Sequence, residues 1–279
     1  MRSPLVVSVK DTNGKENLMN ERKKIAVAGA TGRLGPHIVD VLVERGHEVV
    51  PISRSLGVDV VTGEGLAEAL AGVETVIDAA SHPTADEEPA TEFFVASTRN
   101  LQELGAQAGV RQIVVVSIIG IDDFSAGFLA AKKIHEQEML RGPIPVRILR
   151  AAQFHEFVEP LVGWASRENG VAYLPNMRTQ LVAARTVAET LVDLATDASS
   201  TPTRNGARIP EIAGPRAETL VEVAGLLAAR RGESVRFEGV TNPADPDGAL
   251  YENGGLLPGP DATLAGPTYA DWLESEVRA

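Results

Sequence analysis

The chain has 279 residues, with 26 Lys and Arg against 38 Asp and Glu, and a formal net charge of −12. A hydrophobic share of 44% and a charged share of 23% are typical of a globular protein with a sizeable core, which excludes a wholly disordered chain. The negative charge argues against nucleic acid or an anionic membrane as partner, because phosphate contacts need a surplus of Lys and Arg. Because the chain has no cysteine, disulfides, thiolate nucleophiles and Cys-based metal sites are excluded.

The first 21 residues show no sustained periodicity. They lack the basic start, long apolar centre and small-residue cleavage site of a secretory signal, so we interpret 1–21 as an N-terminal extension. The longest apolar stretches elsewhere fall far short of the ~20 residues that a membrane helix needs. We therefore expect a cytoplasmic protein.

From residue 24 onward, short β-branched runs alternate with amphipathic segments, which predicts βαβ units and a parallel sheet. The predicted strands are 25–28, 48–52, 75–79, 112–118 and 146–149, and the predicted helices are 36–45, 66–70, 88–108 and 127–140. Together they predict an α/β, doubly wound Rossmann core over 22–150. Beyond it the alternation loosens, with helices at 154–164, 185–196 and 220–230 and strands at 171–174 and 208–212. We expect 151–279 to form a smaller C-terminal substrate lobe.

The most specific motif lies between the first predicted strand and helix and reads Gly-Ala-Thr-Gly-Arg-Leu-Gly over 29–35. The diphosphate of a dinucleotide requires a tight turn, close approach of the backbone and amides at a helix N-terminus, which glycines at such spacing allow. The strand–turn–helix context is what turns a Gly pattern into evidence. We assign cofactor contacts to Gly29, Thr31, Gly32, Arg33, Leu34 and Gly35.

The end of the second predicted strand indicates which cofactor the site prefers. An NAD site usually places Asp or Glu there to bind the ribose hydroxyls, whereas this chain has Ser53, Arg54 and Ser55. Arg33, inside the Gly loop, could reach the same 2′-phosphate. Two guanidiniums and two hydroxyls suit a phosphate dianion, through charge-assisted hydrogen bonds. The sequence therefore predicts NADP(H) as the cofactor.

These residues carry a family resemblance. The loop GATGRLG, the arginine after the second strand, the segment LAEALAGVETVI at 66–77 and SIIG at 117–120 are similar to the NmrA-like, atypical branch of the short-chain dehydrogenase/reductase superfamily. The resemblance covers most of 24–279. It implies a Rossmann core that binds NADP(H), with a substrate lobe over the carboxyl ends of the strands. Members of the family divide between reductases of small aromatic or carbonyl compounds and cofactor-sensing regulators.

The resemblance also implies further cofactor contacts. Asp59 and Val60 would border the adenine. Ala79, Ala80 and Ser81 would line the inner ribose and the nicotinamide.

The catalytic pattern departs from that of the superfamily. Its usual acid is a Tyr in YxxxK, where the Lys lowers the pKa of the phenol, but the aligned segment here runs from Phe128 to Lys132. The lysine of the motif is present as Lys132, and Ser117 lies at the usual serine position. Phe128, however, has no proton to donate. A proton donor contributes ~10²–10⁴-fold, so ordinary ketone reduction should be poor. Lys132 and Ser117 stay as catalytic candidates, and Lys132 also as a ligand of the nicotinamide ribose.

A histidine is another source of a proton near neutral pH. His155 lies beside Gln153 at the predicted mouth of the substrate site and is the third catalytic candidate, with His82 as an alternative. His135, one turn past Lys132, is expected to be solvated. We assign the substrate pocket to Phe128, Gln153, Phe154 and Phe157. No His, Asp or Glu set has a metal-ligand spacing, so no metal is predicted.

Three functions fit these residues. The first is an NADP(H)-dependent oxidoreductase acting on a small hydrophobic carbonyl, enone or quinone. Reduction of a quinone or enone gives a delocalised anion that water can protonate, so no tyrosine is required. The second is a redox sensor that binds NADP(H) without catalysis, and the third is a non-redox cyclase, isomerase or lyase of a tailoring pathway. We favour the reductase because its cofactor site is complete. The expected partner is a small-molecule substrate, and a homodimer is left open.

Overall fold

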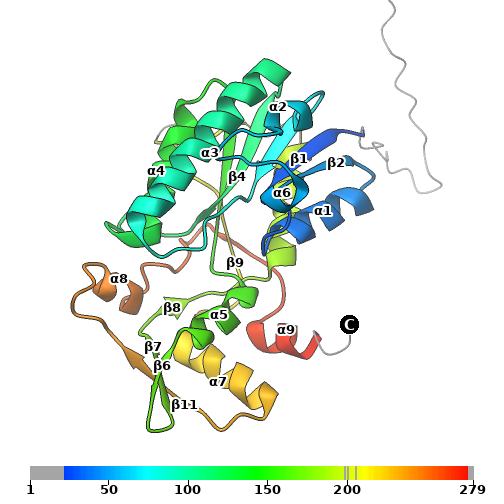
Figure 1. Ribbon diagram of the computed structural model, residues 1–279. Helices are drawn as coiled ribbons and strands as arrows, with labels where there is room; N and C mark the ends of the chain where they lie inside the picture. The colour runs from blue at the N-terminus through cyan, green and yellow to red at the C-terminus, as the bar shows by residue number, and fades with distance from the viewer. Residues whose placement is uncertain (1–21, 198, 200, 205, 276–279) are drawn as a thin grey trace, which may run out of the picture.

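The computed structural model describes residues 22–275 except 198, 200 and 205. The predicted N-terminal extension, 1–21, lies outside the described residues. Seven strands, all paired in parallel, form the central sheet in the order β12-β9-β5-β4-β3-β1-β2 (Figure 1). The prediction of a doubly wound parallel sheet is confirmed.

The first half of the chain alternates strand and helix as predicted. Its strands are β1 (Lys24–Ala28), β2 (Glu48–Ile52), β3 (Thr75–Asp78), β4 (Gln112–Ile118) and β5 (Val146–Ala151). Its helices are α1 (Gly35–Glu44), the 3-10 turn η1 (Arg54–Leu56), α2 (Leu66–Ala69), α3 (Glu87–Ala108) and α4 (Gly127–Arg141). Within the described ranges, no helix combines the length and the apolar character that crossing a membrane would require.

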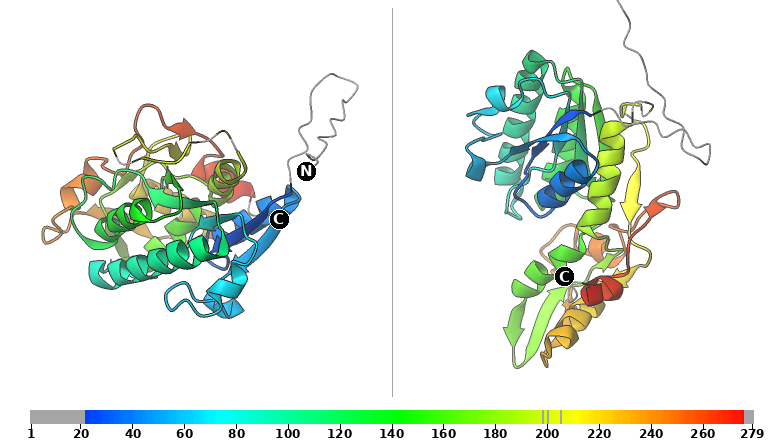
Figure 2. Two further views of the ribbon diagram at one scale, coloured as in Figure 1. Left: turned by 90° about the horizontal axis from the view of Figure 1, so that it is seen from above. Right: turned by 90° about the vertical axis from the view of Figure 1, so that its right-hand side faces the viewer.

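Alternate residues of each strand face opposite layers of helices, because successive side chains of a strand point to opposite sides of the sheet. In β1, Ile25 and Val27 pack in one core cluster with α1 and α6 (Ala184–Thr196). Ala26 and Ala28 belong to a second cluster that includes residues of α3 and α4. The two pairs of helices therefore cover the two faces of the sheet (Figures 1 and 2).

The second half of the chain does not stay in a separate lobe. After leaving the sheet it returns with α6, with β9 (Glu211–Ala213) beside β5, and with β12 (Thr263–Leu264) beside β9. The boundary expected at residue 150 therefore cuts through the central sheet and its helix layer. The later strand β9 returns to the sheet because β5 would otherwise leave an unpaired edge.

The remaining elements form the lobe beyond the carboxyl ends of the strands (Figure 1). They are η2 (His155–Phe157), α5 (Val158–Gly163), β6 (Ser166–Glu168), β7 (Val171–Pro175), β8 (Arg178–Thr179), β10 (Glu218–Thr219), α7 (Leu220–Arg231), β11 (Arg236–Val240), α8 (Gly248–Glu252) and α9 (Tyr269–Ser275). The core of the lobe also includes Ile121 and Phe124, from the loop after β4. That loop is therefore part of the lobe as much as of the Rossmann core.

The tail of the lobe holds the N-terminus of α4. The buried carboxylate of Asp247 accepts hydrogen bonds from the Ser125 amide (2.8 Å), the Ser125 hydroxyl (2.8 Å) and the Ala126 amide (2.9 Å). Burial alone would raise the pKa of Asp247, but these hydrogen bonds outweigh it and lower that pKa. In the same loop Gly120 has a φ of +79°, and a Cβ there would lie 1.8 Å from the carbonyl oxygen of Gly255.

We expect Asp247→Asn to destabilise the protein by about 3 kcal/mol at neutral pH, because hydrogen bonds to a buried carboxylate are lost or weakened. The folded pKa of Asp247 lies below the unfolded value, so this contribution is present above the unfolded pKa and is lost as the pH falls through the folded one. Denaturant unfolding from pH 7 to pH ~3 checks both points. Asp123→Asn, in the same loop, is the control. A stability difference that stays constant down to acid pH would contradict the expectation.

Candidate cofactor and active site

The loop after β1 folds against itself and against β3 without room for side chains. Gly29 has a φ of +79°, and a Cβ there would lie 2.6 Å from the carbonyl oxygen of Ala79. A Cβ on Gly35 would lie 2.1 Å from the carbonyl oxygen of Gly29. The amides of Gly29 and Ala30 donate to the carbonyl of Ile52 (3.0 and 3.1 Å). The glycines therefore let the loop touch the ends of both strands that flank β1.

This loop delivers the first turn of α1 to the point where the strand order reverses. β2 lies on one side of β1 and β3 on the other, and doubly wound sheets bind their ligands at such a switch point. Among the described residues no side chain caps the N-terminus of α1, and its first turn holds no acid. The amides and the helix dipole at this end suit a diphosphate. Thr31, Gly32 and Arg33 are exposed, whereas the side chain of Leu34 is buried in the core.

One basic side chain and two hydroxyl side chains follow the end of β2. The hydroxyls of Ser53 and Ser55 lie 2.9 Å apart, and Arg54 is exposed at the start of η1. No carboxylate within the described part of the chain forms an ion pair with Arg54. The guanidinium therefore remains available for an anion beside the first βα turn.

The residues that the resemblance assigned to the adenine and the nicotinamide lie in two loops with different roles. The carboxylate of Asp59 accepts from the Val61 amide (2.7 Å), and Asn100 on α3 donates to the carbonyls of Val60 and Val61. Asp59 therefore shapes its own loop. The turn after β3, with Ala79, Ala80 and exposed Ser81, lies directly against Gly29. The structure thus brings this turn together with the glycine-rich loop 29–35, the predicted phosphate loop.

Three buried polar groups form a row between α4 and the end of β3. The ammonium of Lys132 donates a hydrogen bond to Nδ1 of His135 (3.0 Å), and Nε2 of His135 lies 3.2 Å from Oδ2 of Asp78. Oδ1 of Asp78 accepts from the amide of Ala80 (3.0 Å). The ring of Phe94 stacks on His135 (centroids 4.6 Å apart) and faces the Lys132 ammonium. The expectation that His135 is solvated is wrong, because the imidazole is fully buried.

The charges of this row follow from its burial. Burial lowers the pKa of Lys132 to about 8, against the pull of Asp78 and Glu136. Burial, and then the charge of Lys132, lower the pKa of His135. Burial alone would raise the pKa of Asp78, but His135 and Lys132 lower it. At neutral pH, Lys132 is therefore an ammonium, His135 a neutral imidazole and Asp78 a carboxylate. The Lys132 ammonium is hydrogen-bonded within this row.

Phe128, at the position of the superfamily's tyrosine, is part of an aromatic row on α3 and α4. Its ring meets the ring of Phe94 edge-on (centroids 5.6 Å apart), Phe94 meets Phe93 in the same way, and Phe93 contacts His82. Phe128 itself is half-buried. This position therefore provides an apolar wall and no proton donor.

Ser117 lies at the carboxyl end of β4, in register with Arg150 of β5. Its side chain is buried, and its hydroxyl has no hydrogen-bond partner among the described residues. A buried hydroxyl without a partner costs about 1–3 kcal/mol. Ser117 therefore keeps an unused donor next to the region where the strands end.

The catalytic assignment placed His155 at the open mouth of the substrate site, but its side chain does not lie there. The side chain is buried, and its Nε2 contacts the carbonyl oxygen of Pro267 (3.2 Å). The rings of Tyr269 and Trp272 on α9 flank it, each 5.4 Å away between centroids. Burial lowers the pKa of His155 to about 4, so the imidazole is neutral at physiological pH. These surroundings suit a packing residue that anchors α9, and they correct the prediction of a proton donor.

The four residues assigned to the substrate pocket have separate neighbours. Gln153 accepts a hydrogen bond from the hydroxyl of Thr179 (2.8 Å), and Phe154 packs against the cluster around β1 and α6. Phe157 meets exposed Trp164 edge-on (5.8 Å between centroids) and carries the guanidinium of Arg33 over its ring. Phe128 belongs to the aromatic row described above. Each of these four side chains therefore contacts a different set of neighbours, and their joint role as a substrate pocket stays a prediction.

The sequence analysis assigned no role to Arg150, whose side chain joins three elements. Its guanidinium binds both carboxylate oxygens of Glu136 on α4 (3.0 and 2.8 Å) and both oxygens of Asp122 in the loop after β4. Arg150 is itself the last but one residue of β5. An alternation of acid and base on neighbouring elements is not readable from sequence spacing, since Asp122 and Arg150 are 28 residues apart.

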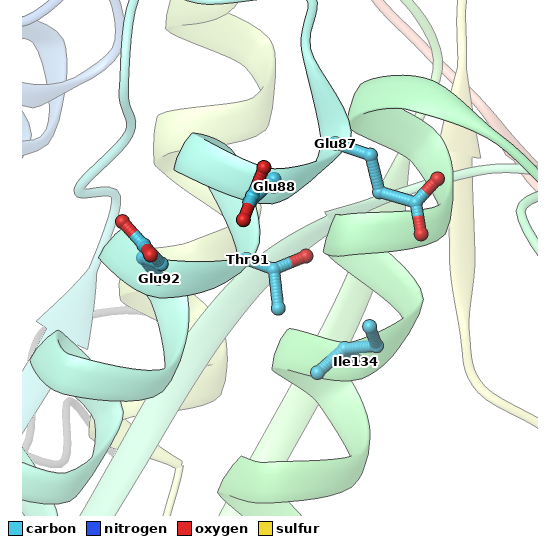
Figure 3. A pocket seen from close by; sticks show the side chains of 5 residues that line it. All are labelled: Glu87, Glu88, Thr91, Glu92 and Ile134. Carbon is cyan, nitrogen blue, oxygen red and sulfur yellow. The ribbon is translucent and has the colours of Figure 1, made fainter.

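Two hollows lie away from the phosphate loop. One is a shallow depression of about 450 Å³ formed by Glu87, Glu88, Thr91 and Glu92 of α3 and Ile134 of α4 (Figure 3). The other, of about 460 Å³, lies beside Arg150. Neither contains a residue predicted to bind cofactor or substrate. Among the described residues, no three His, Asp or Glu side chains gather as a metal ion would require.

We expect Lys132→Met to change how stability depends on pH. The lysine has a pKa of about 8 in the folded protein and an ordinary value of 10.5, so between these values the unfolded chain binds more protons. The wild type should therefore gain stability over the variant as the pH rises through this window, by at most about 1.4 kcal/mol per pH unit. Denaturant unfolding between pH 7 and pH 10.5 measures it. Lys133→Met is the matched control, and parallel pH profiles of wild type and Lys132→Met would refute the expectation.

Comparisons with known proteins agree with this geometry. A family model described as NAD(P)H-binding matches residues 29–144, from the phosphate loop to the end of the loop after α4. A 3-beta-hydroxysteroid dehydrogenase of Mycolicibacterium neoaurum is 32% identical over 122 residues, which are 36% of this chain and 33% of that protein. The photosystem II assembly factor Ycf39 of a Synechocystis strain is 28% identical over 185 residues, which are 57% of this chain and 56% of that protein. The chain thus spans about a third and about half of these relatives.

Solved structures resemble the whole chain in fold. MoeE5 in complex with UDP-glucuronic acid and NAD has a TM-score of 0.66 at 17% identity, covering 91% of this chain and 99% of that one. The NADPH-dependent quinone oxidoreductase QOR2 of Escherichia coli, complexed with NADPH, has a TM-score of 0.63 at 17% identity, with the same shares covered. Residues 29–144 therefore match a family described as NAD(P)H-binding, and the chain shares the Rossmann fold of these solved structures.

Proposed function

We propose that the chain is an NADPH-dependent reductase of a small hydrophobic carbonyl, enone or quinone. The observation that carries the proposal is an intact phosphate loop combined with Phe128 at the position of the proton-donating tyrosine. The first feature supports binding of a nicotinamide cofactor. The second selects acceptors that can be reduced without a donor at that position.

The preference for NADPH rests on the end of β2. Arg54 is exposed and unpaired within the described residues, and Ser53 and Ser55 flank it, so the 2′-phosphate would meet one positive charge and two hydroxyls. An acid that would bind the free ribose hydroxyls of NAD is missing from this position. The solved structures similar in fold include complexes with NAD and with NADPH, so the preference depends on this chain's own residues.

The acceptor class follows from proton supply. In the overall reaction a quinone takes a hydride from NADPH and a proton from water, which gives NADP⁺ and the hydroquinone. The anion formed by hydride addition to a quinone or enone is delocalised, whereas a simple ketone gives an alkoxide that needs a donor at once. Phe128 has none, Lys132 is bound to His135, and His155 is buried. Half-buried Phe128, packed on the ring of Phe94, instead supplies an apolar side chain.

A redox sensor is the second candidate. It is favoured by one observation, that Gln153, Phe154, Phe157 and Phe128 each contact a different set of neighbours. Such a protein would bind NADP(H) and report its oxidation state to a partner. For the non-redox cyclase or isomerase, His155 packs beneath α9, and exposed Asp123 in the loop after β4 is the remaining acid–base candidate. Cytoplasmic location and a homodimer stay predictions.

We expect purified protein to oxidise NADPH with quinones and enones, and to reduce simple ketones ~10²–10⁴-fold more slowly, because the proton donor is missing. Decay of NADPH absorbance against a panel of acceptors measures this, after binding of NADPH has been confirmed. Tight binding without turnover across the panel would reject the reductase. Different affinities for NADP⁺ and NADPH would then support the sensor.

We expect Gly35→Ala to weaken NADPH binding by about tenfold or more, a loss of ~1.4 kcal/mol or more. The added Cβ would lie 2.1 Å from the carbonyl oxygen of Gly29, so the loop must open. Equilibrium titration of NADPH measures the loss. Gly225→Ala on α7, where an added Cβ meets nothing within 4 Å, is the control. Wild-type affinity in Gly35→Ala would show that this loop does not hold the cofactor.

A further inference from the structure

Arg33 bridges the phosphate loop and the lobe. Its side chain starts in the loop after β1 and places the guanidinium carbon 5.1 Å from the centroid of the Phe157 ring, in the 3-10 turn after β5. Phe157 in turn meets Trp164 at the end of α5, and Trp164 is 70% exposed. Arg33 forms no ion pair with a carboxylate of the described residues. It is therefore a cation positioned by an aromatic ring, with its charge uncompensated.

The order of the strands separates Arg33 from Arg54. Arg54 follows β2, which lies next to β1 on one side, whereas Phe157 follows β5, three strands from β1 on the other side. Neighbouring strands are ~4.8 Å apart, so β5 lies about 14 Å from β1. The contact with Phe157 therefore holds the Arg33 guanidinium against the lobe, whereas Arg54 lies at the end of β2. This differs from the sequence-based expectation that both arginines reach one 2′-phosphate.

We propose that Arg33, seated on Phe157, binds the diphosphate of the dinucleotide from the lobe side, while Arg54 alone reads the 2′-phosphate. The inference rests on dinucleotide binding by the 29–35 loop and not on reductase activity. Three observations support it: Arg33 lies within that loop, the charge of Arg33 is uncompensated, and Arg33 contacts Phe157. Arg33 would accordingly act on NADH and NADPH alike, and Arg54 would discriminate between them.

The aromatic contact suits this role chemically. A guanidinium interacts with a ring through its face, while its five N–H donors lie in the plane of the group at its edge. A ring that holds the face therefore leaves the donors available for two phosphate oxygens. Because Phe157 belongs to the lobe, the same contact also ties the lobe to the phosphate loop at the point where the diphosphate would lie.

The experiment compares Arg33→Met with its matched control Arg54→Met. Dissociation constants are measured by calorimetry for NADPH, NADH and adenosine 2′-monophosphate, a probe with a 2′-phosphate and no phosphate at the 5′ position. We expect Arg33→Met to weaken NADPH and NADH by the same factor, about tenfold, and to leave the monophosphate unchanged. Arg54→Met should weaken NADPH and the monophosphate and spare NADH. Circular dichroism and thermal unfolding check that both variants fold.

A third variant tests the aromatic support. Phe157→Leu keeps an apolar side chain but removes the ring, and we expect it to weaken both dinucleotides equally and by less than Arg33→Met does. The inference is overturned if Arg33→Met leaves both dinucleotide affinities unchanged, or if it weakens only NADPH and the monophosphate. A wild type that binds neither dinucleotide would overturn cofactor binding itself, and the role of Arg33 with it.

Discussion

The close approach of Gly29 to the backbone of Ala79 is the constraint on which the candidate site depends. The ends of β1 and β3 are held so near that a side chain at residue 29 would overlap the carbonyl of Ala79. Because β2 lies on the other side of β1, the loop after β1 lies at the point where the strand order reverses. Only at such a point do two neighbouring loops diverge and leave a crevice for a ligand. The phosphate loop, the β2 end and the turn after β3 thus converge.

The second determinant is the way in which α4 is fixed to the sheet. Its inner face presents Lys132, His135 and Glu136, which pair with Asp78 and Arg150 at the ends of β3 and β5. Buried charges are tolerated only when each has a partner, and removing one partner leaves the other uncompensated. The orientation of α4 is therefore set by specific pairs. The same pairs hold the Lys132 ammonium at His135. The contact of Lys132 with the nicotinamide ribose stays a prediction.

The lobe is connected to the Rossmann core at several places. Asp247 caps the start of α4, Gly120 lies against the backbone of Gly255, and Arg33 lies over Phe157. Each contact joins the lobe to a loop at the carboxyl end of a strand, the edge where cofactor and substrate of such folds meet. A ligand bound at this edge would therefore lie next to the contacts that join the lobe to the Rossmann core.

Hydrophobic periodicity and glycine spacing determined the sheet, its helices and the phosphate loop, because these features depend on neighbouring residues in the chain. The strand over Gln112–Ile118 and the glycines at 29, 32 and 35 are local signals of this kind. Only the tertiary structure decided that His135 and His155 are buried, that Arg150 joins Glu136 to Asp122, and that β9 and β12 return to the sheet. These outcomes arise from contacts between residues far apart in sequence. Burial and ion pairing are properties of packed elements, which the spacing of residues along one chain does not record.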